Sequence, residues 1–296
     1  MFRVGCADHI DPALLRRWPL PVPENGTKEA RGTILVVAGS PQMPGAAILA
    51  ATSALRAGAG KLKIATCASV AAHVGVAVPE SFVAALEEAP SGAIALANAP
   101  KIVGDANAAD ALVLGPGLVD ESVTAPLSCR ILAELETAVV LDATSLTACA
   151  ADPHTVRRLG GRVILTPHAG EMAGILGIER SAVEKQPDRA ARDAARNLDA
   201  IVVMKGSTTY IAEPGGALYC NTGGDVGLAT SGSGDTLAGI IGGILARGVT
   251  PLGAALWGVY LHARAGSVLA DRIGLGFLAR EIPAEIPALM REVARA

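Results

Sequence analysis

The sequence predicts an α/β fold in which a mainly parallel central sheet is covered by helices on both faces. Three observations favour this class. Short β-branched or apolar runs alternate along the chain with segments of helical periodicity. The runs are apolar at nearly every position, as expected for strands that are buried on both faces. The composition, 51% hydrophobic but only 3% aromatic over 296 residues, suits a large core built from small aliphatic side chains.

The expected elements alternate along most of the chain. The strands cover 33–38, 61–66, 111–115, 138–142, 162–166, 201–205, 208–212 and 217–221. The helices cover 45–57, 121–135, 169–176, 187–198, 235–247 and 252–269. The segment Glu213-Pro214-Gly215-Gly216 between the last two strands predicts a β-hairpin with a glycine-containing turn. Because no linker, repeat or low-complexity segment divides the chain, one domain of residues 1–296 is expected.

Charge and cysteine content exclude several functional classes. The formal net charge is only -3 and no run of basic residues occurs, so neither a nucleic acid nor an anionic membrane is expected as a partner. The five cysteines are odd in number and never form a CxxC pair, which argues against a disulfide framework and a zinc site. They are expected to be reduced, buried and inert. Small-molecule chemistry remains as the predicted activity.

An uncharged run at 32–55 is long enough to span a bilayer. Its middle, Gly39-Ser40-Pro41-Gln42-Met43-Pro44-Gly45, would break a spanning helix, so a strand, a loop and a helix explain the run better. The N-terminus lacks a cationic region followed by an apolar segment, and no signal peptide is expected. The sequence therefore indicates a cytoplasmic protein.

The loop Ser231-Gly232-Ser233-Gly234-Asp235 leads directly into an apolar segment of helical spacing. Glycine lets the backbone approach a ligand closely, and the free amides and dipole of a helix N-terminus favour an anion such as phosphate. Asp235, in the first turn, is expected to stay ionised and could accept a proton from a substrate hydroxyl. The alternative is a tight turn followed by an aspartate that only stabilises the helix.

Polar or glycine-rich groups also follow the other expected strands. Because ligands of such sheets bind beyond the carboxyl ends of the strands, these groups are expected on one rim. They are the loop 39–45 with Ala46 at the start of its helix, the turn 115–118, Asp142, the segment 166–171 and the pair Lys205-Gly206.

Each polar candidate has a plainer alternative. Asp142 could cap the helix after its strand, Glu171 could cap a helix N-terminus, and His168 could be a surface loop residue. For Lys205 we favour nucleotide contact, because the sequence KGSTT places a cation beside glycine and hydroxyl donors that suit phosphate oxygens. The remaining histidines show no metal-ligand spacing and are expected to be structural; they are His9, His73, His154 and His262.

Seven motifs occur in the order found in a known family. They are GSPQMPGAAILAATSALRAGAGKLKIAT, LVLGPGL, LDATSL, LTPHAGEMAGILG, VVMKGSTTYIA, NTGGDVGLATSGSGDTLAGIIGGILARG and GVYLHARAGSVLA. With them the chain resembles the ADP/ATP-dependent NAD(P)H-hydrate dehydratases, which have a ribokinase-like fold, over residues 32–270. Each motif alone is weak evidence for the family, whereas seven motifs in the same order are specific to it.

The resemblance implies a repair reaction in which hydrated NADH or NADPH is dehydrated at the expense of ADP or ATP, with Mg²⁺ expected. The ring hydroxyl is phosphorylated and phosphate is then eliminated. By resemblance Asp235 is the catalytic base, and the amides of Gly232, Ser233 and Gly234 form an anion hole. The hydrated dinucleotide is expected at Ala46, Gly117, His168 and Asp235. The adenine nucleotide is expected at Lys205, Gly206, Ser207, Thr208, Thr209 and Gly234. No set of metal ligands can be read from the sequence.

The chain departs from the family pattern in several places. Thr144 stands where the family often has a second aspartate, and Ser233 replaces the commoner threonine of GTGD. Fewer than forty residues precede the first expected strand, so an NAD(P)H-hydrate epimerase is expected as a separate protein. Many relatives are tetramers, which implies a homotetramer here. Two other functions stay open: a kinase of a small alcohol such as a vitamin precursor, and a nucleotide-binding regulatory module without turnover.

Overall fold

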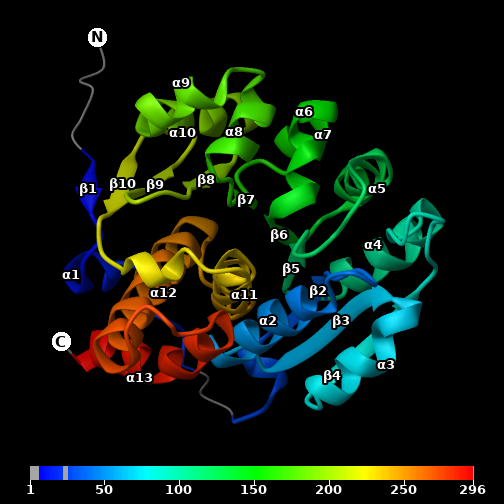
Figure 1. The fold of residues 1–296 in the computed structure, drawn as a ribbon, viewed down its shortest axis with the longest axis horizontal. Helices are drawn as coiled ribbons and strands as arrows, with labels where there is room; N and C mark the ends of the chain where they lie inside the picture. Colours follow the sequence, from blue (N-terminus) through cyan, green and yellow to red (C-terminus); the bar gives the residue numbers. More distant parts are fainter. Residues whose placement is uncertain (1–6, 23–25, 296) are drawn as a thin grey trace.

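The computed structural model describes residues 7–22 and 26–295, and Figure 1 shows their arrangement. Ten strands form one sheet in the order β1-β10-β9-β8-β7-β6-β5-β2-β3-β4. Their bounds are β1 Asp8–His9, β2 Thr33–Val37, β3 Lys61–Cys67, β4 Ser81–Leu86, β5 Ala111–Leu114, β6 Ala138–Leu141, β7 Val163–Leu165, β8 Ile201–Met204, β9 Thr209–Ala212 and β10 Leu218–Asn221.

The strands β2 to β8 are parallel, and β9 runs antiparallel to both β8 and β10. The prediction of a mainly parallel sheet is therefore confirmed. All eight expected strands are present, and β9 and β10 form the expected hairpin, in which Glu213 N–H donates to the Ala217 carbonyl at 3.2 Å. Two strands were not expected. They are β1, which is only two residues long, and the edge strand β4, where Phe82 is exposed.

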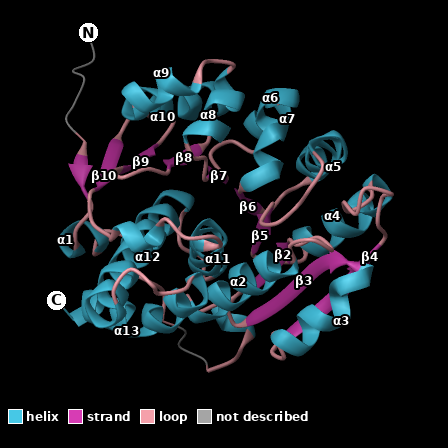
Figure 2. Cartoon of the chain, viewed as in Figure 1, coloured by secondary structure: helices cyan, strands magenta, loops and turns pink. Residues whose placement is uncertain are grey.

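Helices cover both faces of the sheet, as Figure 2 shows. The six expected helices are present, and the described residues contain seven further helices. The helices are α1 Pro12–Leu15, α2 Pro44–Arg56, α3 Ala68–Ala77, α4 Ala99–Asn107, α5 Glu121–Glu134, α6 Ala148–Ala151, α7 Pro153–Arg157, α8 Ala169–Leu176, α9 Arg180–Lys185, α10 Pro187–Leu198, α11 Ser233–Ala246, α12 Pro251–Ile273 and α13 Ile282–Arg295. Short 3₁₀ turns include η3 Ala143–Thr147 and η5 Ala279–Glu281.

Alternate side chains of each strand enter two separate cores, one on each face. From β2, Ile34 and Val36 belong to the core that also holds side chains of α2, α11, α12 and α13, whereas Leu35 and Val37 belong to the core on the opposite face with side chains of α4, α5 and α10. All four side chains are fully buried. Because both faces of the sheet are covered, the strands are apolar at almost every position.

Small residues let α11 and α2 approach closely. A Cβ atom on Gly239 would lie 2.1 Å from the Ala50 carbonyl oxygen, and one on Gly243 would lie 2.4 Å from that of Ala54. Neither glycine has room for a side chain, so the backbones of the two helices are in contact. This packing fixes the N-terminal end of α11 beside the N-terminal end of α2.

Two sequence expectations concern features away from the site. No helix in the described part of the chain is long and apolar enough to cross a membrane. Cys67, Cys129 and Cys149 carry free thiols, and burial raises the pKa of each of them. Raised thiol pKa values mean little thiolate and low reactivity. Cys6 lies outside the described residues.

Candidate functional site

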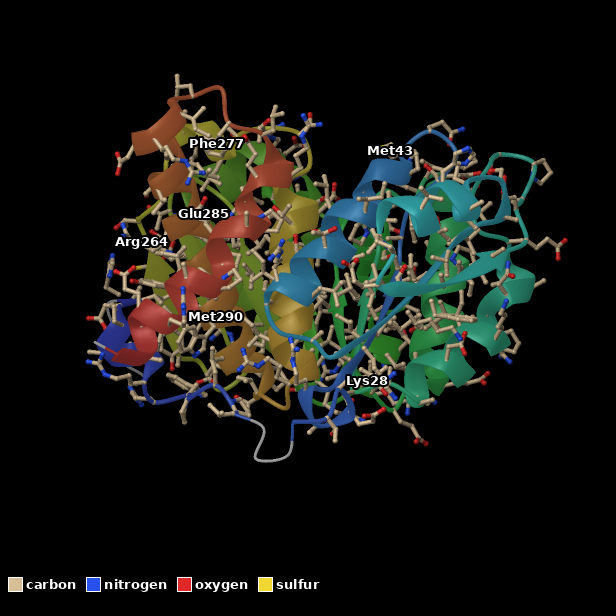
Figure 3. All side chains as sticks on the ribbon, turned by 90° about the horizontal axis from the view of Figure 1, so that it is seen from below. Lys28, Met43, Arg264, Phe277, Glu285 and Met290 are labelled. Carbon is tan, nitrogen blue, oxygen red and sulfur yellow. The ribbon has the colours of Figure 1, made fainter. Side chains whose placement is uncertain are left out.

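The carboxyl ends of the parallel strands meet along one rim of the sheet. At its centre β2 and β5 are neighbours, but the chain leaves them on opposite faces, through α2 after β2 and through α5 after β5. Such a reversal opens a crevice between the two loops, where ligands of open α/β sheets bind. Gly39 N–H donates to the Pro116 carbonyl at 2.8 Å and joins the two loops. Figure 3 shows Met43 and Phe277 at this end of the molecule and Lys28 at the opposite end.

Gly117 and Ala46 are buried against each other at the base of this crevice. Gly117 has a φ of +67°, and a Cβ atom there would lie 2.5 Å from the Ala46 Cβ and 3.0 Å from the Met43 carbonyl oxygen. Only glycine fits such a position without strain. Two of the four residues expected at the dinucleotide, Ala46 and Gly117, are therefore neighbours, with Met43, 46% exposed, beside them.

The loop before α11 brings its glycines against α2. Gly232 adopts a left-handed conformation with φ +88°, and a Cβ atom there would lie 2.4 Å from Leu49 Cδ1 and 3.9 Å from Asp235 Oδ2. In the first turn of a helix the amides have no intrahelical acceptor, so those of Gly234 and Asp235 are available to an anion. The Ser233 N–H instead donates to the Thr230 carbonyl at 3.3 Å. Of the three expected anion-hole amides, that of Ser233 thus has a partner already.

Lys205 connects three strands of the rim. It follows β8, and its Nζ lies 3.0 Å from Asp142 Oδ1, after β6, and 3.7 Å from Glu171 Oε2, after β7. A Cβ atom on Gly234 would lie 3.5 Å from the same nitrogen, which places the lysine against the first turn of α11. Burial acts to lower the pKa of Lys205, but Asp142 and Glu171 more than offset it and the pKa is raised. Lys205 is therefore a fixed positive charge.

The electrostatics of Asp235 differ from the expectation. A helix N-terminus favours the ionised form, but burial first and the Asp142 carboxylate second raise the pKa of Asp235 to about 6, against the opposing effect of Lys205. The carboxyl is still mostly ionised at neutral pH. A carboxyl with a pKa this close to neutrality is suited to take up and release a proton.

Asp142 does not cap the turn that follows it, so that alternative is wrong. Its side chain makes no hydrogen bond to the backbone of η3 and instead accepts from Thr166 Oγ1 at 2.6 Å and from Lys205. The carboxylate is only 2% exposed. Thr144, which replaces the second aspartate of the family pattern, donates its hydroxyl to the Leu118 carbonyl at 2.7 Å. Thr144 thus holds the glycine turn after β5.

His168 and Glu171 cap α8 and also face the site. His168 Nδ1 accepts from the amides of Gly170 and Glu171 at 3.0 and 3.1 Å, and Glu171 Oε2 accepts from His168 N–H at 2.8 Å. The capping alternative for Glu171 is therefore confirmed, but the same oxygen also approaches Lys205. Because Nδ1 is an acceptor, the ring proton of a neutral His168 is on Nε2, and this side chain is 59% exposed.

The rest of the KGSTT segment forms the turn between β8 and β9. Gly206 and Ser207 are exposed, and Thr208 and Thr209 are half-buried. The turn lies next to the Lys205 ammonium group, on the same rim as the loop before α11. The backbone and hydroxyl donors of 206–209 are thus accessible to a ligand that also contacts Lys205.

One residue of this site was not expected from the sequence. His262, on α12, lies with Nε2 3.0 Å from Ser233 Oγ, although it was expected to be merely structural. The available signal was a histidine that follows the apolar first half of a long helix. His9, His73 and His154 are exposed and lie outside the rim contacts described above. Across the described residues, no group of three or more His, Cys, Asp or Glu side chains is arranged to hold a metal ion.

The sequence is similar to proteins of known activity. A family model described as NAD(P)H-hydrate dehydratase matches residues 34–288. The chain is 46% identical over 287 residues to the ADP-dependent (S)-NAD(P)H-hydrate dehydratase of Xanthomonas campestris pv. campestris, covering 97% of each protein. It is 37% identical over 250 residues to the bifunctional NAD(P)H-hydrate repair enzyme Nnr of Moorella thermoacetica, and this match covers 84% of the chain and 47% of that longer protein.

Solved structures are similar over the whole chain. The ADP/ATP-dependent NAD(P)H-hydrate dehydratase of Bacillus subtilis, co-crystallized with ATP/Mg²⁺, matches with a TM-score of 0.81 and 31% identity, covering 97% of this chain and 99% of that one. A ribokinase-like superfamily protein of Enterococcus faecalis matches with a TM-score of 0.84 and 24% identity, covering 100% and 99%. The ribokinase-like fold is thereby confirmed. With the family model matching most of its length, the chain belongs to the NAD(P)H-hydrate dehydratase family.

Proposed function

We propose that this protein uses ADP or ATP to dehydrate hydrated NADH and NADPH back to the normal cofactors. One observation carries the proposal beyond family membership. Asp235, whose pKa is raised to about 6, lies in the first turn of α11 with available amides around it and Lys205 nearby. This arrangement can accept a proton from an alcohol while an anion is bound next to it.

The reaction consists of two steps. Asp235 takes the proton of the hydroxyl on carbon six of the nicotinamide ring, and the hydroxyl oxygen attacks the terminal phosphorus of the nucleotide, which leaves with one phosphate fewer. The carbon–oxygen bond then breaks, inorganic phosphate departs, and the neighbouring ring carbon loses a proton to restore the double bond. Amides of Gly232 and Gly234 stabilise the phosphoryl group, with such donors contributing about 3 kcal/mol each. Phosphorylation is needed because hydroxide is a poor leaving group.

We assign the two ligands to the two halves of the rim. Ala46 and Gly117 would lie beside the hydrated dinucleotide at the β2/β5 crevice, because residues this small let the backbone approach a ligand closely. His168, with its exposed Nε2, would donate a hydrogen bond to the same substrate. The nucleotide would lie on the turn 205–209 and on Gly234, where Lys205 offers a positive charge to its phosphates.

The donor set of the rim fits a magnesium ion that arrives with the nucleotide. Mg²⁺ in such sites is held by one or two carboxylates, with phosphate oxygens and water completing its shell. Asp142 and Glu171 flank the nucleotide region and carry two negative charges against the single charge of Lys205. They would hold the ion, which neutralises phosphate charge when bound.

An absorbance assay tests the proposal. Purified protein is incubated with hydrated NADH or NADPH and with ADP, ATP or no nucleotide, and the absorbance of reduced nicotinamide is followed. Nucleotide-dependent recovery of the band is expected. Absence of recovery together with stable phosphorylation of a small alcohol would indicate a kinase, and nucleotide binding without any turnover would indicate a regulatory module.

The cellular setting follows from the same proposal. We expect subunits of one domain, residues 1–296, that assemble into a homotetramer. We also expect a cytoplasmic location, since hydrated NADH and NADPH form where these cofactors are abundant. Some relatives are longer and are described as bifunctional repair enzymes, as the Moorella protein is. A cross-linking or sedimentation experiment measures the oligomeric state.

A further inference from the structure

His262 contacts the backbone and the side chain of one residue of the phosphate-binding loop. Its Nε2 lies 3.0 Å from Ser233 Oγ and 3.1 Å from the Ser233 carbonyl oxygen. The residue is in the middle of α12, 29 positions away in the sequence. The same carbonyl also accepts from Thr236 Oγ1 at 2.6 Å, so the backbone of Ser233 is held from two sides.

The contact with the carbonyl defines the proton on the imidazole ring. A carbonyl oxygen can only accept, so Nε2 must carry a hydrogen to approach it at 3.1 Å. Burial, and to a lesser extent the charge of Lys205, lower the pKa of His262 to about 4, which keeps the ring neutral at physiological pH. A neutral ring has one proton, and here it is on Nε2. Towards Ser233 Oγ the histidine is therefore a donor.

This assignment leaves the hydroxyl proton of Ser233 available to a third group. Oγ accepts from His262, so its own O–H points elsewhere. The Ser233 side chain is 7% exposed and begins α11, next to Gly234 and two residues before Asp235. Because Ser233 is the first residue of α11, its hydroxyl lies at the end of the helix where an anion is expected.

We propose that His262 is a positioning residue that presents the Ser233 hydroxyl as a hydrogen-bond donor to the terminal phosphate of the nucleotide. The inference rests on the proposed function, because it assumes that this phosphate binds at the N-terminal end of α11. Ser233 thus contributes to phosphate binding through its side chain, while its amide is bonded to Thr230.

The test compares the affinities for ATP with Mg²⁺ and for AMP, measured by calorimetry. AMP lacks the terminal phosphates and serves as an internal control. His262→Leu and Ser233→Ala should each weaken ATP binding about tenfold, as expected for loss of a hydrogen bond to a charged group, and change AMP binding less than about twofold. The double variant should be no weaker than either single variant, because both remove the same bond. His262→Gln, whose amide can donate from nearly the same place, should restore most of the affinity.

His73→Leu, at an exposed histidine of α3, is the matched control and should change neither affinity. Additive losses in the double variant, equal losses for ATP and AMP, or unchanged ATP affinity in His262→Leu would each overturn the inference. If His262→Leu does not fold, the ATP and AMP affinities of Ser233→Ala and His262→Gln still test the inference. The dehydratase assay of the unaltered protein is separate: failure there with the ATP-specific pattern intact refutes the proposed function and leaves the role of His262 supported.

Discussion

Replacing the proposed catalytic base by its uncharged isostere, Asp235→Asn, should remove activity and increase stability. Turnover should fall by about a thousandfold or more, since general-base catalysis and the activated nucleophile are lost together. Stability should rise at neutral pH because the native protein holds this carboxylate in surroundings that disfavour its charge. The two effects together are expected only of a functional buried acid.

The size of the stability gain follows from the pKa shift. The pKa of the Asp235 carboxyl rises from 3.8 to about 6 on folding, and 1.36 kcal/mol per unit gives about 3 kcal/mol as the upper limit at pH 8. Because the native state binds the proton more tightly than the unfolded state, the free energy of unfolding decreases as pH rises between these values. At pH 5 the same shift amounts to about 1.6 kcal/mol, so the advantage of the variant should grow by about 1.4 kcal/mol from pH 5 to pH 8.

Urea unfolding followed by circular dichroism at pH 5, 6, 7 and 8 measures this difference. His262, whose pKa is lowered to about 4, makes both proteins less stable as pH falls below 6.5, but this effect cancels between them. Asp271→Asn, at an exposed aspartate of α12, is the control and should show no such trend. A variant that is less stable than the wild type at pH 8, or a difference independent of pH, would refute the electrostatic account of Asp235.

Three further predictions concern the pH profile, the lysine and the helix packing. Turnover should decline below about pH 6 as the proposed base is protonated, measured as the acid limb of kcat against pH. Lys205→Met leaves the buried Asp142 without its cation; it should weaken nucleotide binding at least tenfold and destabilise the protein by about 3 kcal/mol, as measured by calorimetry and urea unfolding. Gly239→Ala, whose Cβ would lie 2.1 Å from the Ala50 carbonyl oxygen, should destabilise by about 2 kcal/mol or more. The matched change Gly174→Ala in α8, where an added Cβ meets nothing within 4 Å, should stabilise by about 0.5 kcal/mol.

The sequence predicted the central strands because they are buried on both faces, which leaves an unbroken apolar run between loops. It failed at the edge of the sheet. Strand β4 is buried at only two of its six positions, and α3 before it is apolar without a clear period, so neither segment had a strong pattern. A proline inside a segment disfavours a helix there, but helix α13 continues through Pro287.

For the site, glycine spacing identified the loops but not the pairing of side chains. Lys205 and Asp142 are 63 residues apart and meet only because β6, β7 and β8 are neighbours in the sheet. His262 and Ser233 meet because α12 packs on α11. The raised pKa of Asp235 was missed for a related reason. The helix N-terminus is visible in the sequence, whereas burial and the approach of Asp142 depend on the tertiary structure.

The site combines features that oppose folding, and the surrounding packing makes them possible. Asp142 is buried, Ala143 after it has a left-handed φ of +50°, and Asp235 is ionised where its charge is disfavoured. The charge of an exposed aspartate would be solvated by water. Its pKa would then be near 4, which is too low for an efficient base at neutral pH. Gly239 and Gly243 allow α11 to lie directly on α2, and this contact holds the helix that carries the half-buried Asp235 in place. The close packing of α11 on α2 therefore contributes to the burial that, with Asp142, keeps the pKa of Asp235 in the useful range.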